Sequence, residues 1–365
     1  MDERLKKPYN PTENEKNAYR LWESSGFFNP DNLTGKREQS YTILMPPPNA
    51  NGHLHVGHAL GTTIQDIMIR YRRMAGYKAL WLPGADHAGF ETQVVYEKKL
   101  EKEGRSRFGM PREELYKEIL AFTLENKKFM EDEVRALGAS CDWSREKFTL
   151  DPEIIEVVYG TFRKLFADGL VYRGKRMVNW CTKHQTSLSD LETASKTQKD
   201  ALYYISYGPL TVATVRPETI FGDVAVAVHP SDTRYSALVG STITVTTPIG
   251  TMDLQVIADE TVDPDFGTGA LKITPAHDQN DFEMGRRHSL PVIEVIDQYG
   301  RLNEKTGKYT GMKIDEARSA VAKDLAEMGL LVKTEEYEHA VSTCYKCAKT
   351  LEPRILPQWF VRMEP

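Results

Sequence analysis

The feature that most constrains this chain is the segment Tyr41–His58, in which an apolar strand passes through a rigid turn into a pair of histidines. Residues 41–45 are apolar and β-prone, and the three consecutive prolines at 46–48 cannot continue a hydrogen-bonded ladder. Apolar side chains then recur at helical spacing over 64–71, so we predict that a helix begins at 55–57. The segment is therefore the first βα unit of an α/β fold.

The start of that helix has the properties of a phosphate-binding site. Free backbone N–H groups and the positive end of the helix dipole attract anions there. Gly57 allows close approach of a ligand, and His55 and His58 lie on one helical face, where both imidazoles can donate to the same anion. One alternative is an ordinary N-cap with surface histidines. Another is a metal site that includes His53, but no acidic or Cys residue lies nearby in sequence.

Length and charge narrow the class of protein. A chain of 365 residues is expected to hold about two domains. The formal net charge of -5 gives no global case for nucleic acid, so RNA binding would need local basic patches. There is no apolar run of about 18 residues, and the N-terminus MDERLKKP is polar. We therefore expect a cytoplasmic protein with neither a membrane span nor a secretory signal.

The four cysteines are unevenly placed, which argues against a disulfide framework. Cys181 precedes His184 by the same two-residue gap that separates Cys344 from Cys347, and this spacing lets both ligands of a tight turn face one metal ion. The two pairs predict a structural Zn²⁺ site of the Cys3His type. A redox CxxC pair and metal-free reduced thiols are the alternatives, and Cys141 is expected to be a small core residue.

Two regions with different sequence patterns follow each other along the chain. The pattern of the first predicts helices and a strand that alternate as in a parallel α/β half-sheet, with Thr12 and Glu15 as a capping box for the first helix. The predicted elements are a helix from 12 to about 26, a strand at 79–82, and helices from 88, over 111–137 and over 151–168. Past 199, short β-prone runs separated by Gly and Pro predict a mostly-β domain with helices near 278–288 and 315–328.

The residues of the first helix start also carry a family resemblance. The sequence His55-Val56-Gly57-His58 is similar to the signature of class I aminoacyl-tRNA synthetases, and PPPNANGHLHVGHA together with WLPGADHAG at 81–89 resembles the valyl-tRNA synthetases among them. The residues at 50–51 and 90–91 depart from the usual pattern of that family, which puts details of the substrate pocket in doubt.

This resemblance implies a Rossmann-like catalytic domain that uses ATP with Mg²⁺ to charge tRNA(Val) with valine. It implies that His55, Gly57 and His58 act at the ATP site. It also implies that Asp86 binds the valine ammonium in a pocket lined by Pro46, Pro47 and Asn49. Asp86 could instead cap the helix expected from residue 88.

Two further segments, 214–219 and 267–281, are similar to the paired signatures of the editing domain in the same family. A pocket for valine cannot strongly reject threonine, which adds only a hydroxyl, and this pair of amino acids is a standard illustration of that limit. A second site must then hydrolyse Thr-tRNA(Val). The implied editing residues are Thr214, Arg216, Glu218, Thr219, Lys272, Thr274, His277, Asp278 and Asp281.

The chemistry expected of this second site can be divided among its residues. Asp278 and Asp281 offer acceptors for the substrate ammonium, while Thr214, Thr219 or Thr274 would donate to its hydroxyl. Arg216 and Lys272 would lie near the terminal nucleotide. No strong nucleophile is evident, so we expect attack by an ordered water. His277 is either its general base or a satisfied structural histidine.

The expected fold class is α/β, a parallel Rossmann-like half-sheet with an inserted mostly-β editing domain. We expect the catalytic half-domain at 1–190, the insertion at 191–342, and the zinc knuckle with the return to the catalytic domain at 343–365. The lysine loop that this family uses with ATP is not found, so we expect an N-terminal fragment, and a monomer, with tRNA(Val), valine and threonine as its ligands. An isoleucyl- or leucyl-type synthetase and a non-catalytic tRNA-binding module are the alternatives.

Overall fold

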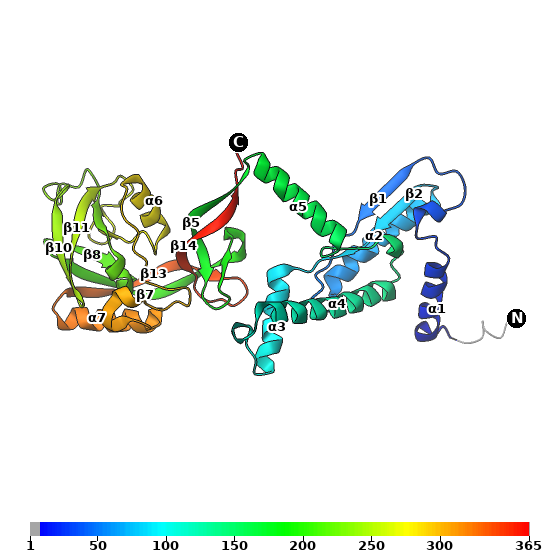
Figure 1. Ribbon diagram of the computed structural model, residues 1–365, viewed down its shortest axis with the longest axis horizontal. Helices are drawn as coiled ribbons and strands as arrows, with labels where there is room; N and C mark the ends of the chain where they lie inside the picture. The colour runs from blue at the N-terminus through cyan, green and yellow to red at the C-terminus, as the bar shows by residue number, and fades with distance from the viewer. Residues whose placement is uncertain (1–7, 365) are drawn as a thin grey trace. The chain divides into compact units, whose positions relative to one another are not determined.

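The structure is a computed structural model that describes residues 8–364 (Figure 1). The polar start of the chain, on which the expected lack of a secretory signal rests, lies largely outside the described residues. No helix within them is long and apolar enough to cross a membrane. Contacts divide the chain into unit 1, Met1–Gly169, and unit 2, Leu170–Pro365. The boundaries expected at 190 and 342 stay predictions, because this division does not define an insertion.

Unit 1 contains the predicted βα unit. Strand β1, Ser40–Leu44, pairs in parallel with β2, Lys78–Leu82, and helix α2, Val56–Met74, connects them. A second parallel pair joins β3, Gly84–Ala85, to β4, Lys147–Phe148. The remaining helices of unit 1 are α1 Pro11–Ser24, α3 Gly89–Lys102, α4 Arg112–Ala136, α5 Pro152–Ala167, and the short η2 Pro30–Asn32, η3 Arg107–Gly109 and η4 Trp143–Arg145.

The predicted helices of unit 1 are confirmed to within a few residues, but the expected capping box of the first is wrong. Asn10 caps α1, its side chain accepting the N–H of Thr12 at 3.2 Å, because Pro11 occupies the first helical position. The core of the unit gathers around Trp81 and Ile69, both fully buried. Cys141 lies in this core as expected.

Unit 2 is mostly β. Its long strands β7, Thr193–Tyr207, and β13, Leu331–Cys344, pair antiparallel, and β8, Leu210–Thr214, extends the sheet on the side of β7. A second sheet has the order β10-β11-β9-β12. Its strands are β9 Ala225–Val228, β10 Thr242–Thr247, β11 Gly250–Ala258 and β12 Ala270–Ile273. The alternation TITVTT in β10 buries every second side chain, as the pleat of a strand requires.

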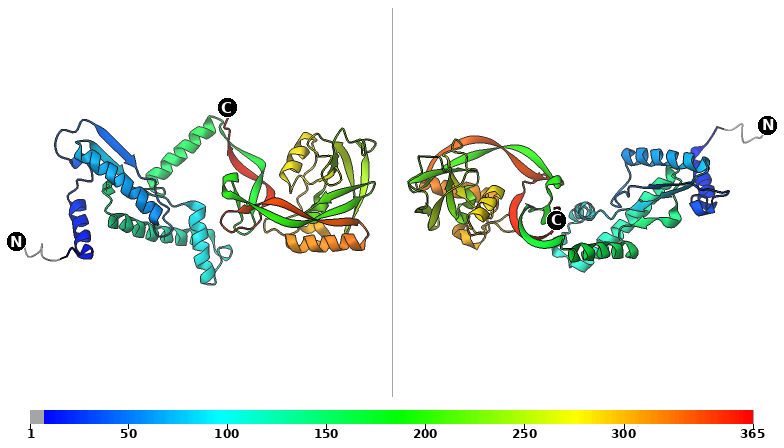
Figure 2. Two further views of the ribbon diagram at one scale, coloured as in Figure 1. Left: turned by 180° about the vertical axis from the view of Figure 1, so that it is seen from behind. Right: turned by 90° about the horizontal axis from the view of Figure 1, so that it is seen from above.

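Two helices and several short turns of helix accompany these sheets. Helix α7, Ile314–Glu327, packs against β13 and the short helix η6, Pro217–Gly222 (Figure 2). Helix α6, Gln279–Arg287, follows β12 and contacts it. The other short helices of unit 2 are η5 Asp190–Glu192 and η7 Glu304–Tyr309.

A third sheet in unit 2, which we call the stem sheet, has the order β14-β5-β6. Its members are β5 Val171–Cys181, β6 Thr186–Leu188 and β14 Glu352–Val361. Strands β5 and β14 pair antiparallel from Glu352 opposite Trp180 to Val361 opposite Val171. The chain therefore enters unit 2 and returns through neighbouring strands, as the predicted insertion requires.

Candidate functional site

The helix start at His55 is built by the two histidines themselves. The Nδ1 atom of His55 accepts the backbone N–H of Gly57 at 3.1 Å, and Nδ1 of His58 accepts the N–H of His55 at 3.2 Å. The two rings lie 3.9 Å apart, and a Cβ on Gly57 would come within 2.9 Å of the His55 ring. A larger residue at position 57 would therefore push the His55 ring away from its capping position.

This cap fixes what the imidazoles can offer. Because both Nδ1 atoms accept hydrogen bonds, each neutral ring carries its proton on Nε2, which leaves two N–H donors for an anion. Partial burial and the neighbouring His55 lower the pKa of His58. The arrangement combines both expectations for this pair, since the same histidines cap the helix and keep a donor each.

Glu133 of α4 holds the loop in front of this helix, and sequence reasoning missed it. Its Oε2 accepts the N–H of Leu54 at 2.8 Å and its Oε1 lies 2.6 Å from Nδ1 of His53. No local pattern links residue 133 to residue 54, so only the fold could reveal the contact. Among residues 8–364, the histidines of this loop are not part of any group of three potential metal ligands.

The predicted valine residues lie close together in unit 1. Asn49 and Asp86 form a β-bridge, in which Asp86 N–H donates to Pro48 O at 2.9 Å. The Oδ1 atom of Asp86 accepts from the N–H of Ala88 at 3.0 Å and from the hydroxyl of Thr149 at 3.2 Å. Asp86 thus contacts the residue before α3, as the capping alternative expected, while Oδ2 makes no hydrogen bond within the described chain.

An apolar cavity of about 150 Å³ lies in the same unit, lined by Leu44, Met45, Pro47, Leu82, Pro83, Gly84, Ala85, Lys147, Phe148, Thr149 and Ile154. Of the four predicted valine residues, Pro47 lines this cavity, whereas Pro46, Asn49 and Asp86 do not. The β-bridge between Asn49 and Asp86 lies just beyond two of the segments that line the cavity, 44–47 and 82–85.

Unit 2 holds a second cavity, of about 200 Å³, which we call the hydrolytic cavity after the hydrolysis expected of its residues from the sequence. Its wall comes from the end of β8, the turn of η6, strand β12 and the start of α6. The residues that line it are Ala213, Thr214, Val215, Arg216, Thr219, Leu271, Lys272, Thr274, His277, Asp278, Asn280 and Asp281. Eight of the nine predicted editing residues are among them, and the ninth, Glu218, is fully buried and bonded to Arg216.

Two carboxylates stand at the start of α6. Asp278 caps the helix, its Oδ1 accepting the N–H groups of Asn280 and Asp281. Asp281 is buried, and its Oδ2 accepts the N–H of Thr274 at 2.8 Å. Burial and then the charge of Asp278 raise the pKa of Asp281 to about 7. A cation bound here would relieve both effects, so the pair is suited to hold an ammonium group.

Lys272 uses all its donors inside the protein. An ammonium has three N–H groups, and those of Lys272 reach Thr274 Oγ1 at 2.6 Å, Thr219 Oγ1 at 2.9 Å and Asp223 Oδ1 at 3.1 Å. Asp223 in turn accepts from the hydroxyls of Thr274 and of Tyr207, the latter at 2.6 Å. Sequence reasoning missed Asp223, whose carboxylate pairs with the ammonium of Lys272, and Tyr207, whose hydroxyl donates to that carboxylate.

These bonds set the polarity of the three threonines. The hydroxyl of Thr274 donates to Asp223 and that of Thr219 donates to Arg216 O, so both can only accept further hydrogen bonds. Thr214 accepts from Arg216 N–H at 3.0 Å, and its own O–H makes no bond within residues 8–364. A ligand hydroxyl would thus have to donate to Thr219 or Thr274, or accept from Thr214.

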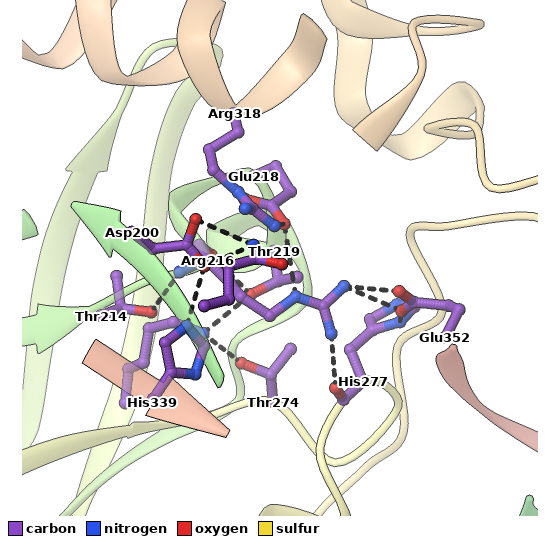
Figure 3. Close-up of polar contacts among 12 residues, drawn as sticks. Asp200, Thr214, Arg216, Glu218, Thr219, Thr274, His277, Arg318, His339 and Glu352 are labelled. Atoms are coloured by element: carbon purple, nitrogen blue, oxygen red, sulfur yellow. Dashed lines mark hydrogen bonds and ion pairs between the residues drawn. The ribbon is translucent and has the colours of Figure 1, made fainter. Parts of the chain in front are cut away.

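Arg216 and His277 are both held by Glu352 of β14 (Figure 3). His277 Nδ1 lies 3.1 Å from Glu352 Oε1, and its Nε2 accepts the N–H of Val295 at 2.9 Å. Since both ring nitrogens are engaged, His277 has no lone pair for a water molecule. Of its two expected roles, the satisfied structural histidine fits this geometry.

The predicted zinc ligands gather at one point in unit 2. The ligand atoms of Cys181, His184, Cys344 and Cys347 all lie within 4.8 Å of one another. Tetrahedral Zn²⁺ with Zn–S bonds of about 2.3 Å and Zn–N bonds of about 2.0 Å places two sulfurs about 3.8 Å apart and sulfur about 3.5 Å from nitrogen.

The observed separations match these values. They are 3.7 Å between the sulfurs of Cys181 and Cys347, and 3.6 Å from His184 Nδ1 to the sulfur of Cys181 and to that of Cys344. The donor set therefore fits tetrahedral Zn²⁺. The CxxC pair is followed by strand β14 and not by a helix, so the redox alternative gains no support.

Comparison with known proteins places this geometry in a family. The sequence profile of the tRNA synthetases class I (I, L, M and V) matches residues 17–365. A valine–tRNA ligase of Carboxydothermus hydrogenoformans is 47% identical over 365 residues, which are 98% of this chain and 41% of the relative. One from Thermotoga maritima is 46% identical over 364 residues, again 98% of this chain and 41% of the relative. The chain thus spans 41% of the length of either relative.

A solved structure also resembles the chain. It is the ternary complex of LeuRS, tRNA and LeuAMS from Agrobacterium radiobacter K84, with 17% identity and a TM-score of 0.45. The likeness covers 94% of this chain and 49% of that one.

Proposed function

The chain belongs to the class I tRNA synthetases of the isoleucine, leucine, methionine and valine group, and from this premise we propose that the whole protein charges tRNA(Val) with valine, while unit 2 hydrolyses Thr-tRNA(Val). The observation that carries the second part is the hydrolytic cavity, because residues from two distant sequence segments line one space. The valine–tRNA ligases at 46–47% identity support the first part. We place the protein in the cytoplasm as a monomer.

In the hydrolytic cavity, the aminoacyl ester would be held by its ammonium. Asp281, with Asp278 beside it, supplies the negative charge, and binding of the cation favours the ionised form of Asp281. The threonine hydroxyl then donates to the free lone pair of Thr219 or Thr274. Valine has no hydroxyl and cannot make this bond. When valine binds, the threonine oxygens of the cavity would lose their water and gain no hydrogen bond in exchange, which disfavours valine.

Hydrolysis consumes a water molecule, and no Cys or Ser lines the cavity to attack the ester before it, so water would attack the ester carbonyl directly. His277 has both nitrogens engaged, so the site would act by positioning and by electrostatics and not by a histidine base. The O–H of Thr214 is the donor best suited to the ester carbonyl or to that water. Arg216 and Lys272, which we expected near the terminal nucleotide, donate hydrogen bonds to groups of the protein, among them Glu352 and Asp223.

Unit 1 would bind the substrates of the charging reaction. At the start of α2, the Nε2–H groups of His55 and His58 would donate to ATP phosphate oxygens. Mg²⁺ neutralises phosphate charge when it accompanies the nucleotide. Asp86 keeps one carboxylate oxygen for the valine ammonium. A valine side chain would enter the apolar cavity beside Pro47.

Zn²⁺ would be structural in this protein. Four protein ligands complete its tetrahedron and leave no open position for catalysis. Cys181 is the last residue of β5 and His184 follows in the turn before β6, while Cys344 is the last residue of β13 and Cys347 lies between β13 and β14. The ion would therefore join the strand that enters unit 2 to the strand that leaves it.

The decisive experiment is single-turnover deacylation with the chain in excess over Thr-tRNA(Val). We expect Thr-tRNA(Val) to be hydrolysed and Val-tRNA(Val) to be spared. Preferential hydrolysis of Val-tRNA(Ile) would point instead to an isoleucyl-type enzyme. Binding of Thr-tRNA(Val) without hydrolysis would reduce unit 2 to a tRNA-binding module, and failure to bind would refute the proposal.

A further inference from the structure

Glu352 lies at the edge of the hydrolytic cavity although it belongs to another sheet. It is the first residue of β14 in the stem sheet, and its side chain is 4% exposed. Its two oxygens accept from Nη2 of Arg216 at 2.9 and 2.7 Å, and Oε1 also meets Nδ1 of His277. Both partners line the cavity. One carboxylate thus holds two parts of the cavity wall that are 61 residues apart in sequence.

We propose that Glu352 is a positioning residue for the hydrolytic cavity, so that the strand returning through the stem sheet fixes the geometry in which the ester is cleaved. This rests on the proposed editing function. Glu352 touches neither substrate nor water in this role. It acts through Arg216 and His277, which it holds in place.

The charges around Glu352 explain why no neighbour could replace it. Arg216 also bonds Glu218, but Glu218 accepts two hydrogen bonds from Arg318 of α7 as well (Figure 3). Two partly exposed guanidinium groups therefore share two buried carboxylates. Without the charge of Glu352, Arg216 would keep only Glu218 as a carboxylate partner, and Glu218 is already bonded to Arg318.

The consequence for the cavity follows from the backbone. Arg216 Nη1 donates to His277 O at 3.0 Å, directly before Asp278, the cap of the helix that carries Asp281. The imidazole of His277 reaches the other way, to the N–H of Val295. A shift of Arg216 or His277 would thus move the turn from which both ammonium-binding carboxylates start.

Nothing in the sequence around 352 suggests this contact. The insertion expected at 191–342 contains every predicted editing residue and leaves Glu352 out. In the structure, Leu351 N–H donates to Ser342 O at 2.9 Å, so the chain is fixed to the end of β13 just before Glu352. The hydrolytic cavity is therefore complete only with the stem sheet in place.

The test compares Glu352→Gln with Glu336→Gln in the whole chain. Glu336 undergoes the same chemical change on β13, where it is 75% exposed and pairs with Lys199. At saturating chain, Glu352→Gln should lower the single-turnover rate with Thr-tRNA(Val) by about 10- to 100-fold, with the half-saturating concentration changed less than about threefold. Glu336→Gln should behave as the parent. An equal rate for Glu352→Gln and the parent overturns the proposal.

A second measurement does not depend on hydrolysis. The N–H of Val295 is bonded to His277, so hydrogen exchange at Val295 reports where that ring lies. We expect faster exchange in Glu352→Gln and unchanged exchange in Glu336→Gln. If the parent does not cleave Thr-tRNA(Val), the proposed function fails. The rate of hydrogen exchange at Val295 in Glu352→Gln and in the parent then still decides whether Glu352 positions the cavity wall.

Glu352→Asp covers the case in which the Gln variant does not fold. Asp keeps the charge but is shorter by one methylene, so it cannot reach Arg216 and His277 together. An intermediate rate, with the same thermal midpoint as the parent to within a few degrees, supports positioning. A parental rate and parental exchange at Val295 in a folded Glu352→Asp variant would overturn it.

Discussion

Asp278 caps the helix in which Asp281 is buried, and its Oδ1 accepts the backbone N–H of Asp281 at 3.0 Å. The capping carboxylate of Asp278 therefore lies beside the carboxylate of Asp281, which is buried away from water. Burial and then this charge raise the pKa of Asp281 to about 7. The residue that we propose to hold the substrate ammonium is therefore also one that lowers the stability of the free protein.

Asp281→Asn should stabilise the chain at high pH. The folded pKa of Asp281 lies above its unfolded value near 4, so the folded state holds an extra proton between about pH 4 and pH 7, and the parent loses stability as the pH rises through that window. Asn keeps an oxygen for the N–H of Thr274. We expect it to be more stable than the parent by about 1 to 3 kcal/mol at pH 8 and equal at pH 4. Urea unfolding at both pH values measures this, and a difference that does not depend on pH would contradict it.

Hydrolysis of Thr-tRNA(Val) should rise with pH through about 7, because the ionised form of Asp281 holds the ammonium. Asp278→Asn keeps a good N-cap but removes the neighbouring charge, so the rise should move to lower pH. The measurement is the single-turnover rate from pH 5.5 to 8.5. A profile that is unmoved by Asp278→Asn would mean that another group titrates.

Tyr207→Phe should destabilise unit 2 more than Tyr204→Phe does, although both tyrosines lie on β7. The hydroxyl of Tyr207 donates to the buried carboxylate of Asp223, whereas that of Tyr204 donates to Glu335, which is 48% exposed. Loss of a buried bond to a charged group costs about 1.5 to 3 kcal/mol, and loss of the exposed one less than about 1 kcal/mol. Denaturant unfolding decides between the two, and equal losses would remove the special role of Asp223.

Zinc-replete protein should contain one equivalent of Zn²⁺, and Cys347→Ser should lower both metal content and thermal stability. Cys141→Ala is the matched control, since Cys141 is buried far from the cluster in sequence and is not one of its ligands. Metal analysis and thermal melts with and without a chelator provide the readout. Less than about half an equivalent in the parent would contradict the site.

His55→Asn should leave the stability of unit 1 unchanged, while His55→Ala should cost about 1 kcal/mol. Asn can accept the N–H of Gly57 as the imidazole does, and Ala cannot. Both variants remove the outward Nε2–H, so both should weaken binding of ATP. If the two lose the same stability, the cap is not what His55 contributes to the fold.

Sequence patterns predicted the parts of this protein that depend on neighbours along the chain. The helix start at His55, the helix near 278–288 and the CxxC pair are all readable from local sequence patterns. The resemblance of two short segments to editing signatures brought in residues that the fold places around one cavity.

What sequence could not supply is the set of partners that the fold brings from far away. Glu133 meets Leu54, Asp223 meets Lys272, and Glu352 meets Arg216, across separations of 79, 49 and 136 residues. These partners decide whether a charged side chain faces a ligand or the protein. For that reason no sequence pattern indicated that Arg216 and Lys272, which we expected near the terminal nucleotide, are also bonded to carboxylates of the protein.

The pairing of Val171 with Val361 has a consequence for how such a protein can be rebuilt. The first and last long strands of unit 2, β5 and β14, pair with each other, so the two ends of the unit lie close together. Unit 2 could therefore be inserted into a loop of another protein without separating the two sides of that loop. Transplanting 170–362 should therefore carry metal ligands, Glu352 and cavity together, whereas a cut at 191–342 would separate the cavity from the carboxylate that shapes it. A transfer of the hydrolytic cavity to another protein would therefore have to include the stem sheet.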